Sequence, residues 1–189
     1  MQNKQGKQES YMGLADKYLP YYTVEERNKW QGDWELIEGV PYALASPSVE
    51  HQRIVRNLIV ELDKEIKKCG IKCEVIPDID YYISEDTVVR TDVIVICGNI
   101  REKVATTPQI IFEVVSPSSV KMDEHIKYKL YEREGVEYYC LIYPFEDRKH
   151  VKIYHLENNR YNKVFETIEE SFEFNLNGCK LRVEFSKIL

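Results

Sequence analysis

Two acidic residues stand within runs of apolar residues. Glu113 interrupts residues 110–116 (IIFEVVS), where Ile, Val and Phe predict a buried β-strand. Asp92 opens the apolar half of residues 87–97 (TVVRTDVIVIC). A buried ionised carboxylate is costly unless it is paired, protonated, hydrated or bound to a cation. If the two strands are neighbours, both carboxylates can approach on one face, and a hard divalent cation would relieve their repulsion.

Both acids also have an ordinary structural interpretation. Asp92 could lie at a strand edge, paired with Arg90 or capping a turn. Glu113 could accept a hydrogen bond from a tyrosine hydroxyl in this chain of 14 tyrosines. Structural ion pairs also place charges in such segments, so periodicity alone leaves both interpretations open.

Upstream of these strands, local signals predict a short helix, a hairpin and a long helix. A capping box at residues 23–26 predicts a helix from Val24 to about Trp30. Residues 34–44 (WELIEGVPYAL) predict a hairpin with its turn at Glu38-Gly39. Apolar residues at helical spacing then predict an amphipathic helix over 49–68, with Ser46 or Ser48 as its N-cap.

Downstream, three strands are expected over 72–84, 87–97 and 108–116. A crossover helix over about 119–134, with the apolar stripe Met122, Ile126 and Leu130, leads to a strand over 137–144. A further hairpin over 151–166 turns at Asn158-Asn159, and two short strands follow.

This order predicts an α+β fold (an α/β sandwich), in which a mixed central sheet is flanked by helices and carries N-terminal and C-terminal β-hairpins. A chain of 189 residues fits one domain with a substantial core. We expect residues 1–20 to form a flexible N-terminal arm and residues 21–189 to form the single domain.

Composition narrows the partners and the compartment. A net charge of −6 argues against a general nucleic-acid coating protein, although metal ions can supply local positive charge to a nuclease. The sequence contains neither an apolar signal-peptide region nor an apolar run of membrane length, so we expect a cytoplasmic protein without a membrane partner. The five cysteines are dispersed and lack a CxxC motif, which predicts reduced thiols.

The ordered motifs resemble the bacterial family of putative restriction endonucleases, within the PD-(D/E)XK nuclease superfamily. The resemblance covers residues 22–144 through the segments YTVEE, WELIEGVPY, SPSVEHQRIVRNLIVEL, RTDVIVI, IIFEVVSPSS and HIKYKLYEREGVEYYCLIYP. It implies a restriction-endonuclease-like core.

The resemblance also implies residue roles. Asp92 matches the motif aspartate, with Thr91 in place of the preceding proline, and Glu113 matches the second acid. Both would hold Mg²⁺ or Mn²⁺, with the Val114 carbonyl as a further ligand. Val115 occupies the usual position of the motif lysine, and Lys127 in the following helix is the matching replacement.

Two upstream residues match further family positions. Glu35 and His51 join the candidate catalytic set, where His51 would bond a ligand water or orient Glu35. Each has an alternative: Glu35 as a surface acid paired with a lysine, and His51 as a helix-start residue. Ser116 and Ser119 are most simply interpreted as part of a loop and helix cap. A contact with a phosphate group is the second interpretation.

Lys127 has two interpretations as well. Asp123 and Lys127 are spaced like an ordinary surface ion pair on a helix. However, Lys127 also lies about 100° from Ile126 on the helix, at the border of the apolar stripe, from which its ammonium could cross toward Glu113.

The function implied by the resemblance is metal-dependent endonuclease activity that hydrolyses phosphodiester bonds in DNA. The alternative is a non-catalytic nucleic-acid- or protein-binding module on the same fold, which the displaced lysine and the acidic charge favour. DNA is the expected partner, and a homodimer would suit cleavage of both strands of a duplex.

Overall fold

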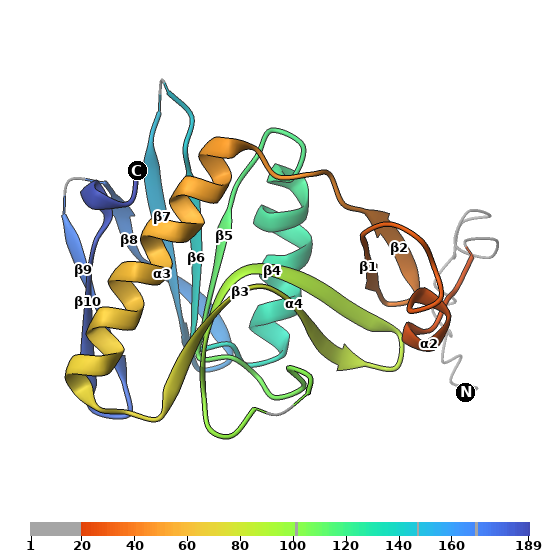
Figure 1. Ribbon diagram of the computed structural model, residues 1–189, viewed down its shortest axis with the longest axis horizontal. Helices are drawn as coiled ribbons and strands as arrows, with labels where there is room; N and C mark the ends of the chain where they lie inside the picture. Colours follow the sequence, from red (N-terminus) through yellow and green to blue (C-terminus); the bar gives the residue numbers. More distant parts are fainter. Residues whose placement is uncertain (1–19, 101, 147, 169) are drawn as a thin grey trace, which may run out of the picture.

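The computed structural model describes residues 20–100, 102–146, 148–168 and 170–189. Residues 1–19 of the expected N-terminal arm lie outside the described residues. The described chain has a mixed α+β architecture with one large mixed sheet, a small C-terminal two-stranded sheet and few helices (Figure 1). The predicted α+β class is therefore confirmed. Within these ranges, every helix is too short or too polar to cross a membrane.

The large sheet has eight strands, in the order β2-β1-β4-β5-β6-β7-β8, with β3 also paired to β4. They are β1 (Trp34–Ile37), β2 (Val40–Ala43), β3 (Cys73–Ser84), β4 (Thr87–Cys97), β5 (Ile110–Val114), β6 (Tyr138–Tyr143), β7 (His150–Glu157) and β8 (Arg160–Thr167). Neighbours are antiparallel except β5 and β6, which are parallel because a helical crossover joins them. The small sheet pairs β9 (Ser171–Leu176) with β10 (Cys179–Glu184), and a short 3₁₀ helix, η2 (Phe185–Lys187), follows.

The helix starts follow the predicted caps. The first helix, α2 (Val24–Arg27), begins with the capping box of Thr23 and Glu26 and ends three residues before the predicted end. The long helix, α3 (Val49–Cys69), begins at Ser48, whose hydroxyl accepts the His51 N–H, and ends at Gly70 in the left-handed conformation with φ +66°.

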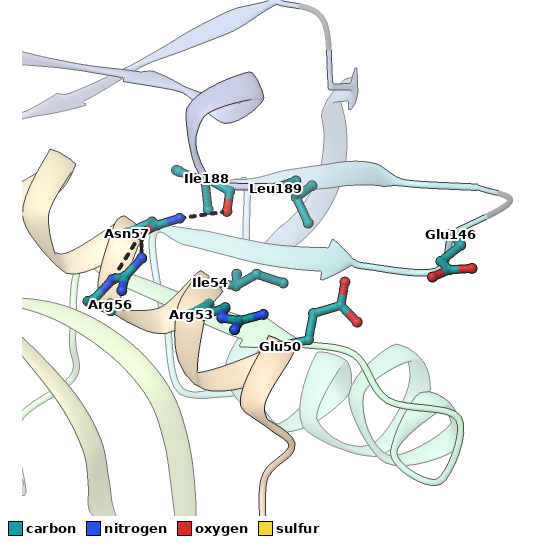
Figure 2. A pocket seen from close by; sticks show the side chains of 8 residues that line it. All are labelled: Glu50, Arg53, Ile54, Arg56, Asn57, Glu146, Ile188 and Leu189. Carbon is teal, nitrogen blue, oxygen red and sulfur yellow. Dashed lines mark hydrogen bonds between the residues drawn. The ribbon is translucent and has the colours of Figure 1, made fainter.

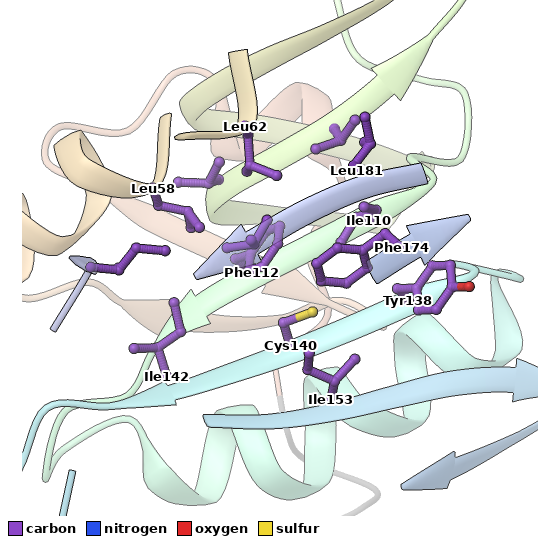
Figure 3. Packing of buried hydrophobic residues seen from close by; sticks show 14 of the residues in the cluster. Leu58, Leu62, Ile110, Phe112, Tyr138, Cys140, Ile142, Ile153, Phe174 and Leu181 are labelled. Atoms are coloured by element: carbon purple, nitrogen blue, oxygen red, sulfur yellow. The ribbon is translucent and has the colours of Figure 1, made fainter. Parts of the chain in front are cut away.

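Two hydrophobic cores lie on opposite faces of the large sheet. On β5, Ile110 and Phe112 pack in the core beneath α3 and the β9–β10 hairpin (Figure 3). Ile111 packs in the other core with residues of the crossover helix, and Val115 continues this face just beyond the strand. Because side chains alternate along a strand, Glu113 belongs to the face of Ile111 and Val115.

The crossover helix departs from the prediction in its first half. It consists of a π-helical segment, η1 (Met122–Lys127), followed by α4 (Tyr128–Arg133). Of the predicted apolar stripe, Leu130 is buried, but Ile126 is 36% exposed, so that part of the prediction is wrong.

The π segment explains which side chains face inward instead. Asp123, Lys127 and Tyr131 are each at most 5% exposed. In an α-helix, positions eight residues apart differ by about 80° in direction. A π turn contains more residues than an α turn, because its hydrogen bonds span five residues, and this reduces the drift. The three side chains therefore stay close to one line along the inner face.

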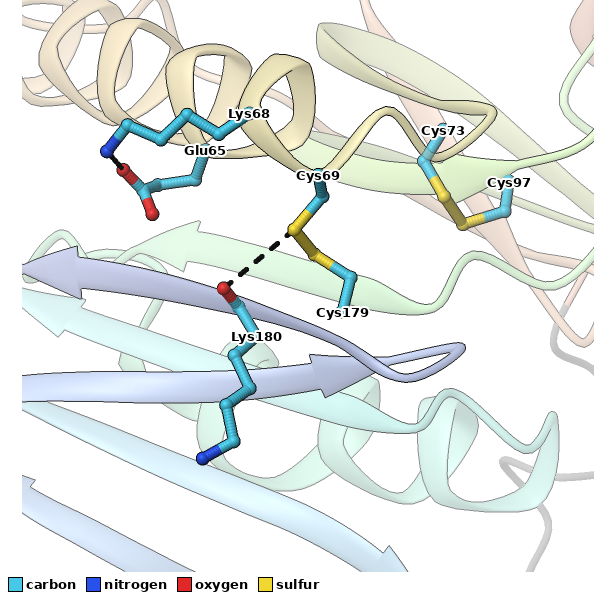
Figure 4. The surroundings of a disulfide bond; sticks show 7 residues. All are labelled: Glu65, Lys68, Cys69, Cys73, Cys97, Cys179 and Lys180. Carbon is cyan, nitrogen blue, oxygen red and sulfur yellow. Dashed lines mark hydrogen bonds and ion pairs between the residues drawn. A yellow bond between two sulfur atoms is a disulfide. The ribbon is translucent and has the colours of Figure 1, made fainter.

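The cysteine prediction is wrong for four of the five thiols. Disulfides join Cys69 to Cys179 and Cys73 to Cys97, near the last turn of α3 (Figure 4). Cys140 is free and buried. The partners are 110 and 24 residues apart, so local spacing gave no sign of the pairs. Disulfides are typical of oxidising compartments, and the cytoplasmic location stays a prediction.

Candidate active site

The candidate residues gather where β4 changes its pairing partner. β4 pairs with β1 at Val88 and with β5 from Val93 to Val95. Between these pairings, main-chain groups of β4 form hydrogen bonds with side chains. Buried peptide groups need such partners, so polar side chains at this junction are favoured for the fold as well as for chemistry.

Glu35 on β1 and Lys127 on η1 bind the main chain of Arg90 together. The Arg90 N–H donates to Oε1 of Glu35 at 2.9 Å, and the Lys127 ammonium donates to the Arg90 carbonyl at 2.8 Å. Lys127 Nζ also lies 2.7 Å from Oε1 of Glu35. Glu35 therefore pairs with a lysine, as the structural interpretation of this residue predicted. The pair is buried rather than at the surface, because Glu35 is only 1% exposed.

Asp92 and Glu113 meet across the diverging strands. The Asp92 N–H donates to Oε2 of Glu113 at 3.3 Å, and the Val114 N–H donates to Oδ2 of Asp92 at 2.7 Å. The Asp92 side chain is 25% exposed, whereas Glu113 is buried. The suggested Asp92–Arg90 pair is not formed: the Arg90 guanidinium binds Asp33 and Asp80.

Glu113 has both kinds of partner that the sequence suggested. Lys127 Nζ lies 3.2 Å from Oε1 of Glu113, and the Tyr131 hydroxyl donates to the same oxygen at 2.9 Å. Sequence reasoning did not single out Tyr131. The available signal was its position four residues after Lys127, which places both side chains on one helix face.

His51 serves the helix start and also reaches the junction. Its N–H donates to Ser48, and its Nε2 lies 3.0 Å from Oδ2 of Asp92. Nδ1 is buried without a hydrogen-bond partner among the described residues. Burial lowers the pKa of His51, but the hydrogen bond and charge of Asp92 outweigh burial, so the pKa is raised above its usual value. His51 contacts Asp92, and no contact with Glu35 is found among the described residues.

Carboxyl groups outnumber the buried cation at this site. Three carboxyl groups, those of Glu35, Glu113 and Asp123, are buried around a single buried ammonium, and Asp92 lies beside them. Burial raises the pKa of Glu113 well above its usual value and that of Asp123 to about 6. Burial lowers the pKa of Lys127, but Glu113, Glu35 and Asp123 outweigh it and hold that pKa well above its usual value. Such a site attracts protons and cations.

Comparison with known proteins shows the family. The family model described as "Uma2: Putative restriction endonuclease" matches residues 16–176, most of the chain. The chain belongs to the Uma2 family. It is also similar to a protein of Anabaena variabilis ATCC 29413, whose crystal structure is described as that of a putative nuclease. That match has 17% sequence identity and a TM-score of 0.71, covers 89% of this chain and 99% of the other, and shows the shared fold. A search of curated proteins found no match.

The donor set of this Uma2 protein suits a hard divalent cation. In the described ranges, no three His, Cys, Asp or Glu side chains are arranged as a complete metal cage. Mg²⁺ seldom needs one, because it is usually held by one or two carboxylates together with water and substrate phosphate. Asp92 and Glu113 are two such carboxylates, Asp92 is open to solvent, and Val114 lies beside both.

Ser119 contacts the buried Asp123 of this site, whose N–H donates to the Ser119 carbonyl at 2.9 Å and whose side chain accepts a hydrogen bond from the Ser119 hydroxyl. Ser116 and Ser119 cap the turn after β5, since the N–H of each donates to the hydroxyl of the other at 2.9 and 3.2 Å. A surface hollow of about 440 Å³ lies beside the start of α3 (Figure 2). It is lined by Glu50, Arg53, Ile54, Arg56, Asn57, Glu146, Ile188 and Leu189, and by none of the candidate site residues.

Proposed function

We propose that this Uma2 family protein is a metal-dependent endonuclease on a restriction-endonuclease-like core, a Mg²⁺- or Mn²⁺-dependent enzyme that hydrolyses phosphodiester bonds in DNA. One observation carries the proposal. The Lys127 ammonium lies between Glu35 and Glu113, and Glu113 in turn meets Asp92 where β4 and β5 diverge. Membership of a family described as putative restriction endonucleases supports the same reaction.

The metal ligands would be the Asp92 and Glu113 carboxylates and the Val114 carbonyl. When bound there, the metal would polarise the scissile phosphate and lower the pKa of an attacking water. His51 would hold the Asp92 carboxylate in place through its 3.0 Å contact. Because His51 contacts the partly exposed Asp92 rather than Glu35, its role would be to orient a metal ligand.

Lys127 would stabilise negative charge on the phosphate. An ammonium group has three N–H donors, and three acceptors surround that of Lys127: Glu35, Glu113 and the Arg90 carbonyl. It would therefore exchange one of these partners for a phosphate oxygen. The contact with Glu113, the longest at 3.2 Å, would cost least to lose. Glu35 would keep the ammonium near the site throughout.

The alternative is a non-catalytic module that binds nucleic acid or protein on this fold. The occupied donors of Lys127 favour it, because they give the lysine a complete structural role. The net charge of −6 also favours it for a protein partner. The expected homodimer and cytoplasmic location stay predictions under either function.

Incubation of supercoiled plasmid with Mg²⁺, Mn²⁺ or EDTA tests the proposal. An endonuclease would convert the plasmid to nicked or linear forms in either metal and leave it intact in EDTA. Fluorescence anisotropy with a labelled duplex in Ca²⁺ measures DNA binding, and its comparison with the cleavage result separates the two functions. Binding without cleavage in Mg²⁺ and Mn²⁺ would favour the non-catalytic module.

A further inference from the structure

The hydroxyl of Tyr131 is directed at one oxygen of the proposed metal ligand Glu113. It donates to Oε1 at 2.9 Å, and Tyr131 has no exposed surface. Its ring packs edge-on against Tyr139, with ring centroids 5.1 Å apart. The hydroxyl therefore has little freedom to turn toward another acceptor.

Three donors fix the Glu113 carboxylate, two from the crossover helix and one from β4. Tyr131 and Lys127 bind Oε1, and the Asp92 N–H binds Oε2. Lys127 would leave Oε1 when it turns toward a phosphate, whereas the buried Tyr131 hydroxyl would remain. A phenol also donates a hydrogen bond without a formal charge, so it orients the carboxylate without neutralising it.

We propose that Tyr131 is a positioning residue that holds the Glu113 carboxylate in the orientation needed to bind a divalent metal. This inference rests on the proposed function. Hydrogen bonds to metal-ligating carboxylates fix their direction, and loss of such a partner typically weakens metal affinity or activity by about 10- to 100-fold. Tyr131 would act through Glu113 and would touch neither metal nor DNA.

Tyr161 provides a matched control for a purely structural role. Its hydroxyl donates to the Val136 carbonyl at 2.9 Å, and the residue is 7% exposed. Tyr131→Phe and Tyr161→Phe therefore each remove one buried hydroxyl and one hydrogen bond while keeping the ring. Only Tyr131→Phe removes a donor from a carboxylate oxygen of the proposed site.

The experiment is calorimetric titration of wild type, Tyr131→Phe and Tyr161→Phe with Mn²⁺ in the absence of DNA. We expect Tyr131→Phe to bind Mn²⁺ about 10- to 100-fold more weakly and Tyr161→Phe to bind like wild type. The Mn²⁺ concentration for half-maximal nicking should rise by the same factor in Tyr131→Phe, while saturating Mn²⁺ restores most of the rate. Wild-type Mn²⁺ affinity in Tyr131→Phe would overturn the proposal, even if its melting temperature fell.

The same titration separates this inference from the proposed function. A wild-type protein that binds Mn²⁺ but does not nick DNA would refute the endonuclease, and the calorimetric comparison would still decide the role of Tyr131. A wild-type protein that binds no Mn²⁺ would overturn both.

Discussion

Asp92 and Glu113 are each hydrogen-bonded to the main chain of the other's strand. The Asp92 N–H donates to the Glu113 carboxylate, and the N–H of the residue after Glu113 donates to the Asp92 carboxylate. Each acid therefore links the two strands just where their regular pairing ends. Replacement by the matching amide keeps a carbonyl oxygen as acceptor but removes the charge. Such variants can test the proposed metal site without opening the sheet.

Asp92→Asn should abolish stabilisation by divalent metal. A ligand that binds only the folded state raises the melting temperature, and removal of one of two carboxylates removes most of that binding. We expect Mn²⁺ to raise the melting temperature of wild type but not that of Asp92→Asn, whose stability in EDTA is unchanged or higher. A Mn²⁺ response in Asp92→Asn equal to that of wild type would place the metal elsewhere.

Lys127→Met should destabilise the fold and reduce nicking. The substitution leaves Glu35 and Glu113 buried beside each other without their cation, and breaking a buried pair in this way costs about 3–5 kcal/mol. Urea unfolding at neutral pH in EDTA measures this cost. Nicking at saturating metal should fall by about 10²-fold or more, because the lost charge acts on the transition state.

Lys129→Met is the matched control for Lys127→Met. Lys129 is largely exposed and pairs with Glu132 at 2.8 Å, so the change in the free energy of unfolding should stay within about 0.5 kcal/mol. If both variants changed the free energy of unfolding equally little, Lys127 would form only an ordinary surface ion pair with Asp123, as their spacing in the sequence suggests. Retained nicking in folded Lys127→Met would remove it from the site.

The fold was predictable wherever local signals agree with the tertiary structure. The turns at Glu38-Gly39 and Asn158-Asn159 have positive φ at both residues, as hairpins of this kind require. The Ser48 cap and the apolar face of α3 likewise appear where the sequence pattern set them. In these elements, the preference of neighbouring residues agrees with the tertiary contacts, such as the hydrogen bond from the Glu38 N–H to the Thr87 hydroxyl.

The site was predictable only in part, because its contacts are long-range. Asp92 and Glu113 were found as charges in apolar strands, whereas Glu35, His51 and Lys127 came from the resemblance to a family. The spacing of Asp123, Lys127 and Tyr131 places them on one helix face, but the sequence does not show that this face is the buried one, because the π turn moves the inner face away from Ile126. The disulfides depend on strand register and helix packing, which no local pattern encodes.

Asp123→Asn should change how stability depends on pH. Burial raises the pKa of Asp123 from 3.8 to about 6, so the folded protein keeps a proton that the unfolded chain loses in this range. Its contribution to stability is therefore present below pH 3.8 and is lost as the pH rises through about 6. Relative to wild type, Asp123→Asn should gain up to about 3 kcal/mol in free energy of unfolding across this range.

Urea unfolding in EDTA at several pH values between about 4 and 7 measures this difference. The comparison with wild type cancels the titration of groups that the Asp123 charge does not reach, whereas His51 and Glu113, whose pKa values that charge raises, contribute to the difference. Parallel pH profiles for the two proteins would contradict the raised pKa.

The thiol count tests the cysteine pairing. Alkylation of denatured, non-reduced protein should modify one residue, Cys140, and alkylation after reduction should modify five. Reduction should also lower the free energy of unfolding by about 2–5 kcal/mol per disulfide, because each bond limits the unfolded chain. Mass spectrometry reads the count directly. Five modified thiols without reductant would contradict both disulfides and support the reduced cytoplasmic state.

The most direct test of the proposed active site compares the nicking rates of wild type and Glu113→Gln on supercoiled plasmid. We predict that wild type nicks in Mg²⁺ or Mn²⁺ but not in EDTA. Folded Glu113→Gln should nick more slowly by about 10²-fold or more, since it lacks one of the two carboxylates that would hold the metal. Equal rates in the two proteins, or no nicking by wild type in either metal, would contradict an active site at Asp92 and Glu113.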